Sequence, residues 1–140
     1  RRLTDGALEK GFFFEPAVFS GVKPGMRLHQ EEVFGPVLSI VEVGDFEEAL
    51  AAANGVDFGL SASLYTRDAN TAMKFVERAE VGMVHVNNPT VGGEAQLPFG
   101  GWKSTGVGER EMAEEGAEFF TQLKTVFFDY TGTVRTSKLY

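Results

Sequence analysis

The sequence predicts an α/β fold built on a parallel βαβαβ unit, with one further strand near the C-terminus. Apolar segments rich in β-branched residues alternate along the chain with segments whose apolar residues recur at helical spacing. Two of the helical segments each follow an aspartate that can cap a first turn. Strands and helices in this order favour a parallel sheet with right-handed crossovers. The 43% hydrophobic content of 140 residues is typical of one globular domain of ordinary size.

The first half of the chain supplies the first strand and helix of this unit. Residues 12–19 are too aromatic for solvent and too short for a helix, so we expect extended structure packed on the core. A polar connection over 29–35 leads into a β-branched strand at 37–43. A helix is predicted over 45–55, because Asp45 stands at the N-cap position with a glutamate three residues later.

The second half completes the unit. We expect a strand at 60–65, a helix capped by Asp68 that runs to about residue 80, and a third strand at 83–86. A helix is then predicted over 109–122. A last strand is predicted over 124–130, where apolar side chains on both faces would leave a sticky edge if the strand stood alone.

Composition excludes several classes of function. The net charge is −7 and no basic stripe occurs, which argues against nucleic acid as a partner. No apolar run approaches the ~20 residues that span a bilayer, and no signal-peptide pattern opens the chain, so we expect a cytoplasmic protein without membrane contact. The cysteine count is zero, which excludes a cysteine nucleophile within these residues. His29 and His85 stand apart, and we expect no metal site and a packed, hydrogen-bonded His85.

One long stretch, 81–111, is where we expect a ligand. A buried strand ends at Asn87, and a glycine-rich loop follows it. In open α/β sheets, ligands bind just beyond the carboxyl ends of the strands. Pro98 and the glycines that follow Phe99 would fix the direction of that ring. Lys103 and Arg110 are expected to secure loops through hydrogen bonds instead of performing chemistry.

Two motifs carry a resemblance to a known family. Residues 98–111 read PFGGWKSTGVGERE and are similar to the C-terminal signature of the aldehyde dehydrogenase superfamily. Residues 31–37 read EEVFGPV and resemble the Glu-x-Phe-Gly-Pro motif of the same family. The resemblance extends from about residue 11 to 130, and the Gly-Gly-Glu run at 92–94 is closest to semialdehyde dehydrogenases. It implies a partial catalytic domain over 1–122 and an oligomerisation strand and tail over 123–140.

The family reaction implied by this resemblance is NAD(P)-dependent oxidation of an aldehyde to a carboxylic acid. In the family, the nucleophilic cysteine, the oxyanion-binding asparagine, the water-activating glutamate and the cofactor domain all precede the Glu-x-Phe-Gly-Pro motif. None has a counterpart in this sequence. We therefore expect a truncated dehydrogenase that is inactive as an isolated chain, with no catalytic residues and no tight binding of NAD or NADP.

The resemblance also assigns candidate site residues. Glu32 matches the glutamate that accepts hydrogen bonds from the ribose hydroxyls on the nicotinamide side, and Phe34 matches a ring packed near that ribose. We expect both roles to be vestigial here, and the alternatives are a solvated loop acid and a core aromatic. Four residues match the region that lines the substrate route: Asn87, Gly92, Gly93 and Phe99. For Phe99, a buried loop anchor is an equal alternative.

Three functions remain open at this level. The chain could be an inactive dehydrogenase piece that forms homo-oligomers through 124–130. It could be one half of a split enzyme that a complementary chain completes. It could also be a non-catalytic module that regulates full-length relatives through its edge strand.

Overall fold

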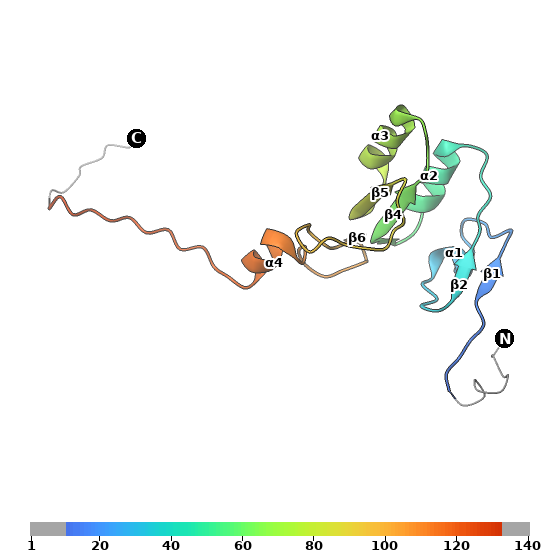
Figure 1. The fold of residues 1–140 in the computed structure, drawn as a ribbon, viewed down its shortest axis with the longest axis horizontal. Coiled ribbons are helices and arrows are strands. Elements are labelled where there is room, and N and C mark those ends of the chain that lie inside the picture. Colours follow the sequence, from blue (N-terminus) through green and yellow to red (C-terminus); the bar gives the residue numbers. More distant parts are fainter. Residues whose placement is uncertain (1–10, 133–140) are drawn as a thin grey trace.

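A computed structural model describes residues 11–132 and confirms an α/β fold with parallel strands (Figure 1). The expected polar segments at the two ends, 1–10 and 133–140, lie outside the described residues. The division into 1–122 and 123–140 stays a prediction.

The best-packed part is a strand–helix–strand unit. Strands β4 (Ser61–Leu64) and β5 (Met83–Val86) pair in parallel, and helix α3 (Ala69–Arg78) connects them. Helix α2 (Phe46–Asn54) lies beside α3, as Figure 1 shows. The core lies between these helices and the strands. Its buried side chains are Leu50, Phe75 and Ala79, with Phe46, Ala62, Leu64, Val81 and Val84 packed against them.

The two helices begin where the sequence predicts. The Asp45 carboxylate accepts a hydrogen bond from the backbone N–H of Glu48 at 2.9 Å, and Asp68 accepts one from Thr71 at 2.8 Å. Each bond satisfies an N–H group that the first helical turn leaves without a partner. The Glu48 carboxylate accepts from the N–H of Gly44 at 2.7 Å, one residue before the position that a capping box uses.

The predicted first strand of the unit pairs with a different neighbour. The order β2–α2–β4–α3–β5 is present, but β2 (Val37–Ser39) pairs in parallel with β1 (Ala17–Phe19), and no ladder joins it to β4. The aromatic N-terminal segment provides the partner, since the N–H of Ile40 donates to the carbonyl of Phe19 at 2.8 Å. A single turn of helix, α1 (Arg27–Gln30), lies between these strands in the chain.

Two further elements follow the central loop. Strands β3 (Phe58–Gly59) and β6 (Trp102–Lys103) form an antiparallel pair that was not predicted. Helix α4 (Ala113–Phe119) is shorter than the predicted 109–122. Its start is delayed because Glu111 exchanges two backbone hydrogen bonds with Phe99, at 2.8 and 2.7 Å, and so extended pairing occupies the residues before it.

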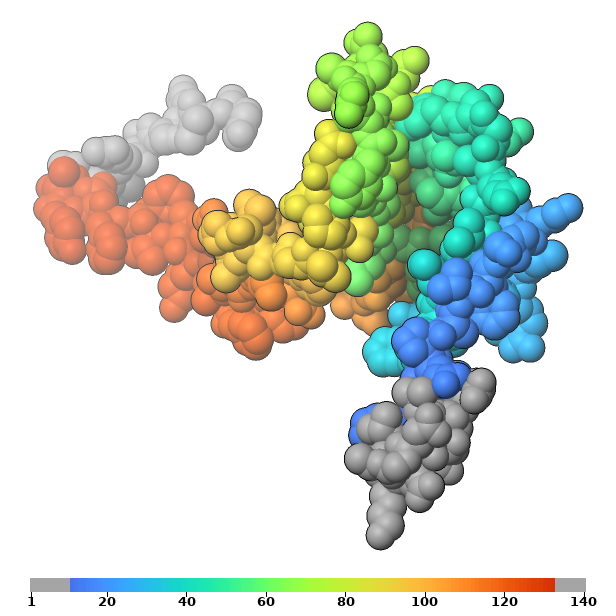
Figure 2. Space-filling model, turned by 45° about the vertical axis from the view of Figure 1, so that its right-hand side comes forward, coloured from blue at the N-terminus to red at the C-terminus, as the bar shows by residue number. Residues whose placement is uncertain are grey.

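The predicted strand over 124–130 is not a strand in this structure. The segment after α4 leads away from the rest of the chain (Figures 1 and 2), and residues 124–130 pair with no other described strand. A strand is defined by its ladder, and without a neighbour the backbone groups have nothing to pair with. The apolar side chains lie open, with Phe127 92% exposed. No helix in the described part of the chain is long and apolar enough to cross a membrane.

Candidate functional site

Two cavities each have residues of the segment 98–105 in their walls. Pro98 and Phe99, at its start, line a cavity of about 380 Å³ beside β5. Ser104 and Thr105, at its end, line a cavity of about 450 Å³ beside α1. Both volumes fall in the range of roughly 300–1,000 Å³ that small-molecule sites occupy. One short segment therefore forms part of both walls.

The cavity beside β5 brings together three of the four predicted substrate-lining residues. Gly92, Gly93 and Phe99 all lie on its wall, and His85 and Met112 join them. A side-chain carbon added at Gly93 would meet no atom within 4 Å, so the loop leaves room at this point. Phe99 is half-buried, and its backbone is fixed by the two bonds to Glu111.

The fourth residue, Asn87, is directed elsewhere. Its side-chain oxygen accepts from the N–H of Thr66, and its amide nitrogen donates to the Thr66 carbonyl, both at 2.9 Å. Its φ of 55° is left-handed, which asparagine tolerates better than most residues. Asn87 is absent from the lining of the cavity and instead ties the end of β5 to the chain after β4.

The cavity beside α1 contains Glu32. Glu31, the residue before Glu32, accepts two hydrogen bonds from the Arg27 guanidinium, both at 2.7 Å. These bonds lower the pKa of the Glu31 carboxyl. Glu32 accepts no hydrogen bond from another described residue, so both of its oxygens remain available. Phe34 does not line this cavity. The residue is 92% exposed, and its φ is 50°.

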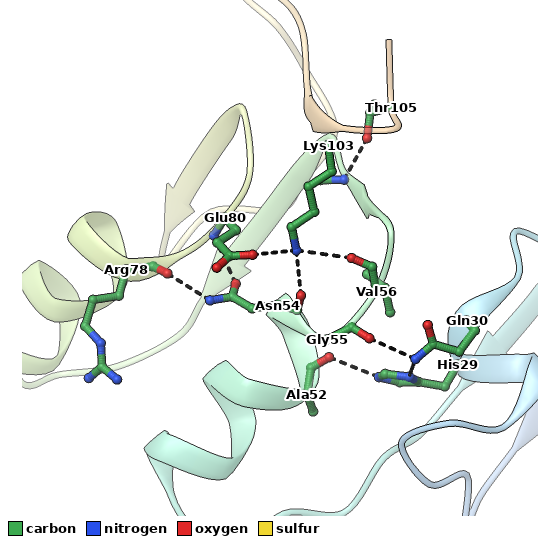
Figure 3. Close-up of polar contacts among 11 residues, drawn as sticks. His29, Gln30, Ala52, Asn54, Gly55, Val56, Arg78, Glu80, Lys103 and Thr105 are labelled. Atoms are coloured by element: carbon green, nitrogen blue, oxygen red, sulfur yellow. Dashed lines mark hydrogen bonds and ion pairs between the residues drawn. The ribbon is translucent and has the colours of Figure 1, made fainter.

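A histidine and a glutamine that sequence reasoning missed hold α1 against the end of α2 (Figure 3). His29 Nε2 lies 3.0 Å from the carbonyl oxygen of Ala52, so this nitrogen carries the proton. His29 Nδ1 accepts from Gln30 Nε2 at 2.9 Å, and Gln30 Nε2 also donates to the Gly55 carbonyl at 2.9 Å. No pattern in the sequence signals these contacts, because the partners lie more than twenty residues away.

Lys103 secures the segment that contributes to both cavities, as predicted (Figure 3). Its ammonium donates to the carbonyls of Asn54 at 2.5 Å and Val56 at 3.1 Å, and it pairs with Glu80 at 2.8 Å. The side-chain amide of Asn54 in turn bonds the carbonyl of Arg78 and the N–H of Glu80, both at 2.9 Å. The ends of α2 and α3 are thereby linked to β6.

Arg110 secures the segment near its other end. Its guanidinium donates to the carbonyl of Gly100, as predicted for this residue. Gly82 contacts the same carbonyl so closely that a side-chain carbon there would collide with it. The backbone of 98–101 is therefore seated directly on the start of β5.

The expectation for His85 was wrong in one respect. His85 is half-buried and is one of the residues that line the cavity beside β5, but its side chain makes no hydrogen bond to another described residue. The strand pattern predicts its burial, whereas the open space in front of it depends on the path of the loop over 87–98.

Residues 1–126 match the aldehyde dehydrogenase family, and the chain belongs to that family. This confirms the resemblance that the motifs at 31–37 and 98–111 indicate.

Two semialdehyde dehydrogenases and one solved structure are similar to most of this chain. An alpha-ketoglutarate semialdehyde dehydrogenase of Haloferax volcanii is 51% identical over 89% of this chain and 26% of its own length. An alpha-ketoglutaric semialdehyde dehydrogenase of Bacillus subtilis is 41% identical over 90% of this chain and 26% of its own. Betaine aldehyde dehydrogenase from Staphylococcus aureus, solved in complex with NAD+, matches with a TM-score of 0.81 and 35% identity, over 86% of this chain and 23% of that one. The chain thus spans about a quarter of the length of these relatives.

Proposed function

We propose that this chain forms two walls of an aldehyde dehydrogenase active site, one toward the nicotinamide-side ribose and one toward the incoming aldehyde. The observation that carries the proposal is the pair of cavities that share the segment 98–105, one lined by Glu32 and the other by Gly92, Gly93 and Phe99. In this assignment the reaction is NAD(P)-dependent oxidation of an aldehyde to a carboxylic acid, and these residues act together with polypeptide that supplies the nucleophile.

Glu32 fits the ribose role on geometric grounds. Its carboxylate has two acceptor oxygens without partners among the described residues, and it lies on the wall of a cavity of about 450 Å³. Vicinal hydroxyls of a ribose can donate to both oxygens. A nicotinamide cofactor, when bound, would accept the hydride from the substrate. The adenine and pyrophosphate would be held by residues outside this sequence.

The nucleophile must also come from elsewhere. The 140 residues contain no cysteine, so no thiolate can attack the aldehyde from this chain. We propose that the chain alone does not oxidise aldehydes and that polypeptide equivalent to the first three quarters of its relatives completes the site. That polypeptide could be covalently continuous with these residues or a separate chain.

A semialdehyde is the proposed substrate class. Two of the relatives described above are named for alpha-ketoglutarate semialdehyde and share 51% and 41% of their matched residues with this chain. The glycines at 92 and 93 leave space for a polar tail beyond the aldehyde.

Glu32 provides a direct test of the cofactor wall. The chain would be mixed with the N-terminal three quarters of the Bacillus subtilis relative, and aldehyde-dependent NAD(P)H formation would be followed by absorbance. We expect Glu32→Gln to raise the KM for the cofactor roughly tenfold, because one charge-assisted acceptor is lost. Glu31→Gln is the matched control, because Arg27 already engages Glu31. Equal effects of the two substitutions would contradict the assignment.

A second function is favoured by the open apolar segment after α4. Exposed aromatic side chains at 127, 128 and 130 are suited to strand pairing with another chain. We propose that 124–130 mediates assembly, either with a second copy of this chain or with a related dehydrogenase subunit. Light scattering on the purified chain and on a Phe127→Lys variant would test this, since the substitution should shift the mass toward that of the monomer. An unchanged mass would argue against it.

A further inference from the structure

We propose that His85 recognises the oxygen-bearing end of the substrate that lies opposite its aldehyde group. This inference rests on the proposed function, because it names the substrate class that the cavity beside β5 selects. His85 would act as a specificity residue through a hydrogen bond, with no part in the reaction at the aldehyde carbon.

The strand places His85 at this cavity. Successive side chains of β5 point to opposite faces, and Val84 packs against the core formed by Leu50, Phe75 and Ala79. His85, the next residue, therefore belongs to the face turned away from that core, and it is one of the residues that line the cavity of about 380 Å³. The residue is half-buried, so bulk water reaches only part of it.

His85 and His29 differ in how their ring nitrogens are engaged. Both ring nitrogens of His29 are engaged, one by the Ala52 carbonyl and one by Gln30. No hydrogen bond from His85 reaches any other described residue, and its ring nitrogens are open to solvent, because no buried side-chain nitrogen or oxygen of the described residues lacks a partner. The ring nitrogens are therefore free to bond an acceptor placed in the cavity.

Further donors lie on the same wall. The side-chain amide of Asn88 and the backbone N–H groups of Gly92 and Gly93 also make no hydrogen bond within the described residues. The remaining wall is largely apolar and includes Leu97, Phe99 and Met112. Donors gathered beside an apolar wall suit a short carbon chain that carries oxygen acceptors, such as a 2-oxo group or a carboxylate.

Glu94 is the acidic residue that lines this cavity. Its carboxylate accepts from Gln96 at 3.1 Å, and its charge opposes a bound carboxylate. We therefore expect the hydrogen-bond donors to provide the affinity for a substrate with an acidic tail. Glu94→Gln should raise that affinity, because it removes a repulsive charge. An amino aldehyde would show the opposite response to that substitution.

The chain contains two histidines, which permits a clean binding test. Imidazole ¹H–¹⁵N spectra of the labelled chain would be recorded during titration with alpha-ketoglutarate, using pentanoate as the probe that lacks both the oxo group and the second carboxylate. We expect the His85 resonances to shift with alpha-ketoglutarate more than with pentanoate, while those of His29 stay in place. Unmoved His85 signals, or equal shifts of both histidines, would overturn the proposal.

Kinetics of the complemented enzyme separate this inference from the proposed function. His85→Phe should raise the KM for alpha-ketoglutarate semialdehyde roughly ten- to hundredfold while leaving that for hexanal within about twofold, since one hydrogen bond to a charged or strongly polar group is lost. His85→Gln keeps a donor and should recover most of the difference. A mixture inactive with every aldehyde would contradict the proposed function. An active mixture in which His85→Phe changes both KM values alike would contradict the role of His85.

Discussion

Lys103 fixes the segment 98–105, which contributes to both cavities, to the ends of two helices. Its ammonium joins the carbonyls of Asn54, at the end of α2, and of Val56, just beyond it, to the carboxylate of Glu80 after α3. Its backbone belongs to β6. The side chain is 22% exposed, so these contacts are partly shielded from water. The sequence indicates that Lys103 bonds to loops, but it does not indicate which loops, because the partners are more than twenty residues distant.

We expect Lys103→Met to loosen this segment. Two backbone carbonyls would lose a charged donor, and hydrogen bonds of this type contribute about 1.5–3 kcal/mol each. Amide exchange at Ser104, whose N–H donates to the Asp57 carbonyl at 2.9 Å, should become at least tenfold faster. Lys124→Met, at an exposed position after α4, is the control and should leave Ser104 unchanged. Equal protection in both variants would show that Lys103 does not hold the segment.

Glycines provide a second residue-scale test. Gly82→Ala should displace 98–101 from β5, because the new carbon collides with the Gly100 carbonyl and the Arg110 guanidinium. Gly93→Ala should leave the fold intact, because the added carbon meets open space. The Phe99 and Glu111 amides, which bond each other's carbonyls, would report the difference in a ¹H–¹⁵N spectrum. Similar spectra for Gly82→Ala and the unchanged chain would contradict this packing.

At the scale of elements, sequence pattern predicts the helices better than the sheets. Asp45 and Asp68 mark the starts of α2 and α3 because an N-cap is a local feature that a few residues determine. The pairing of β2 with β1, and the two-residue strands β3 and β6, depend on contacts between distant segments. Strands this short carry no alternation that could be recognised in advance. The start of α4 was missed because the Phe99–Glu111 pairing is likewise non-local.

Helix α3 should respond to pH through its cap. The side-chain hydroxyl and then the backbone N–H of Thr71 donate to Asp68 and lower the pKa of its carboxyl. A lowered folded-state pKa means that the stabilisation is fully present above the ordinary aspartate pKa and is lost as the pH falls through the folded value. The Thr71 amide signal should therefore move below the ordinary aspartate pKa, and its protection against exchange, relative to an unfolded chain at the same pH, should fall.

Asp68→Asn is the matched control for this titration. Asparagine caps helices about as well as aspartate but does not titrate, so the Thr71 amide should keep one position across the same range. A Thr71 signal that titrates equally in the variant would assign the change to another acid. Asp45→Ala should destabilise α2 by about 1 kcal/mol, because the cap of that helix is lost.

The described residues bury little of their own apolar surface. Their buried hydrophobic residues are Val22, Leu50, Phe75 and Ala79, while large apolar side chains along the described part of the chain are exposed. Phe34, Phe120 and Leu123 are among the open side chains. This is the surface expected of residues that fold against a larger body, in keeping with the quarter of its relatives' length that the chain spans.

The sequence predicts the family, while the roles given to the candidate site residues stay predictions. The motifs at 31–37 and 98–111 indicate the family, and three of the four substrate-lining candidates do share a cavity. The residues that the motifs leave out, His85, Gln30 and Asn54, acquire their environments only when distant segments meet. The segment 124–130 has a sequence pattern typical of a strand but forms none in this structure, because no neighbouring strand is present among the described residues to complete a ladder.

The most direct measurement is aldehyde-dependent NAD(P)H formation by this chain, alone and mixed with the N-terminal three quarters of the Bacillus subtilis relative. The mixture would be tested with the nucleophilic cysteine of that polypeptide either intact or replaced by serine. We expect no product from the chain alone or from the serine mixture, and steady NAD(P)H formation from the cysteine mixture. Oxidation of an aldehyde by the purified chain alone would contradict the account, and so would a cysteine mixture that forms no product.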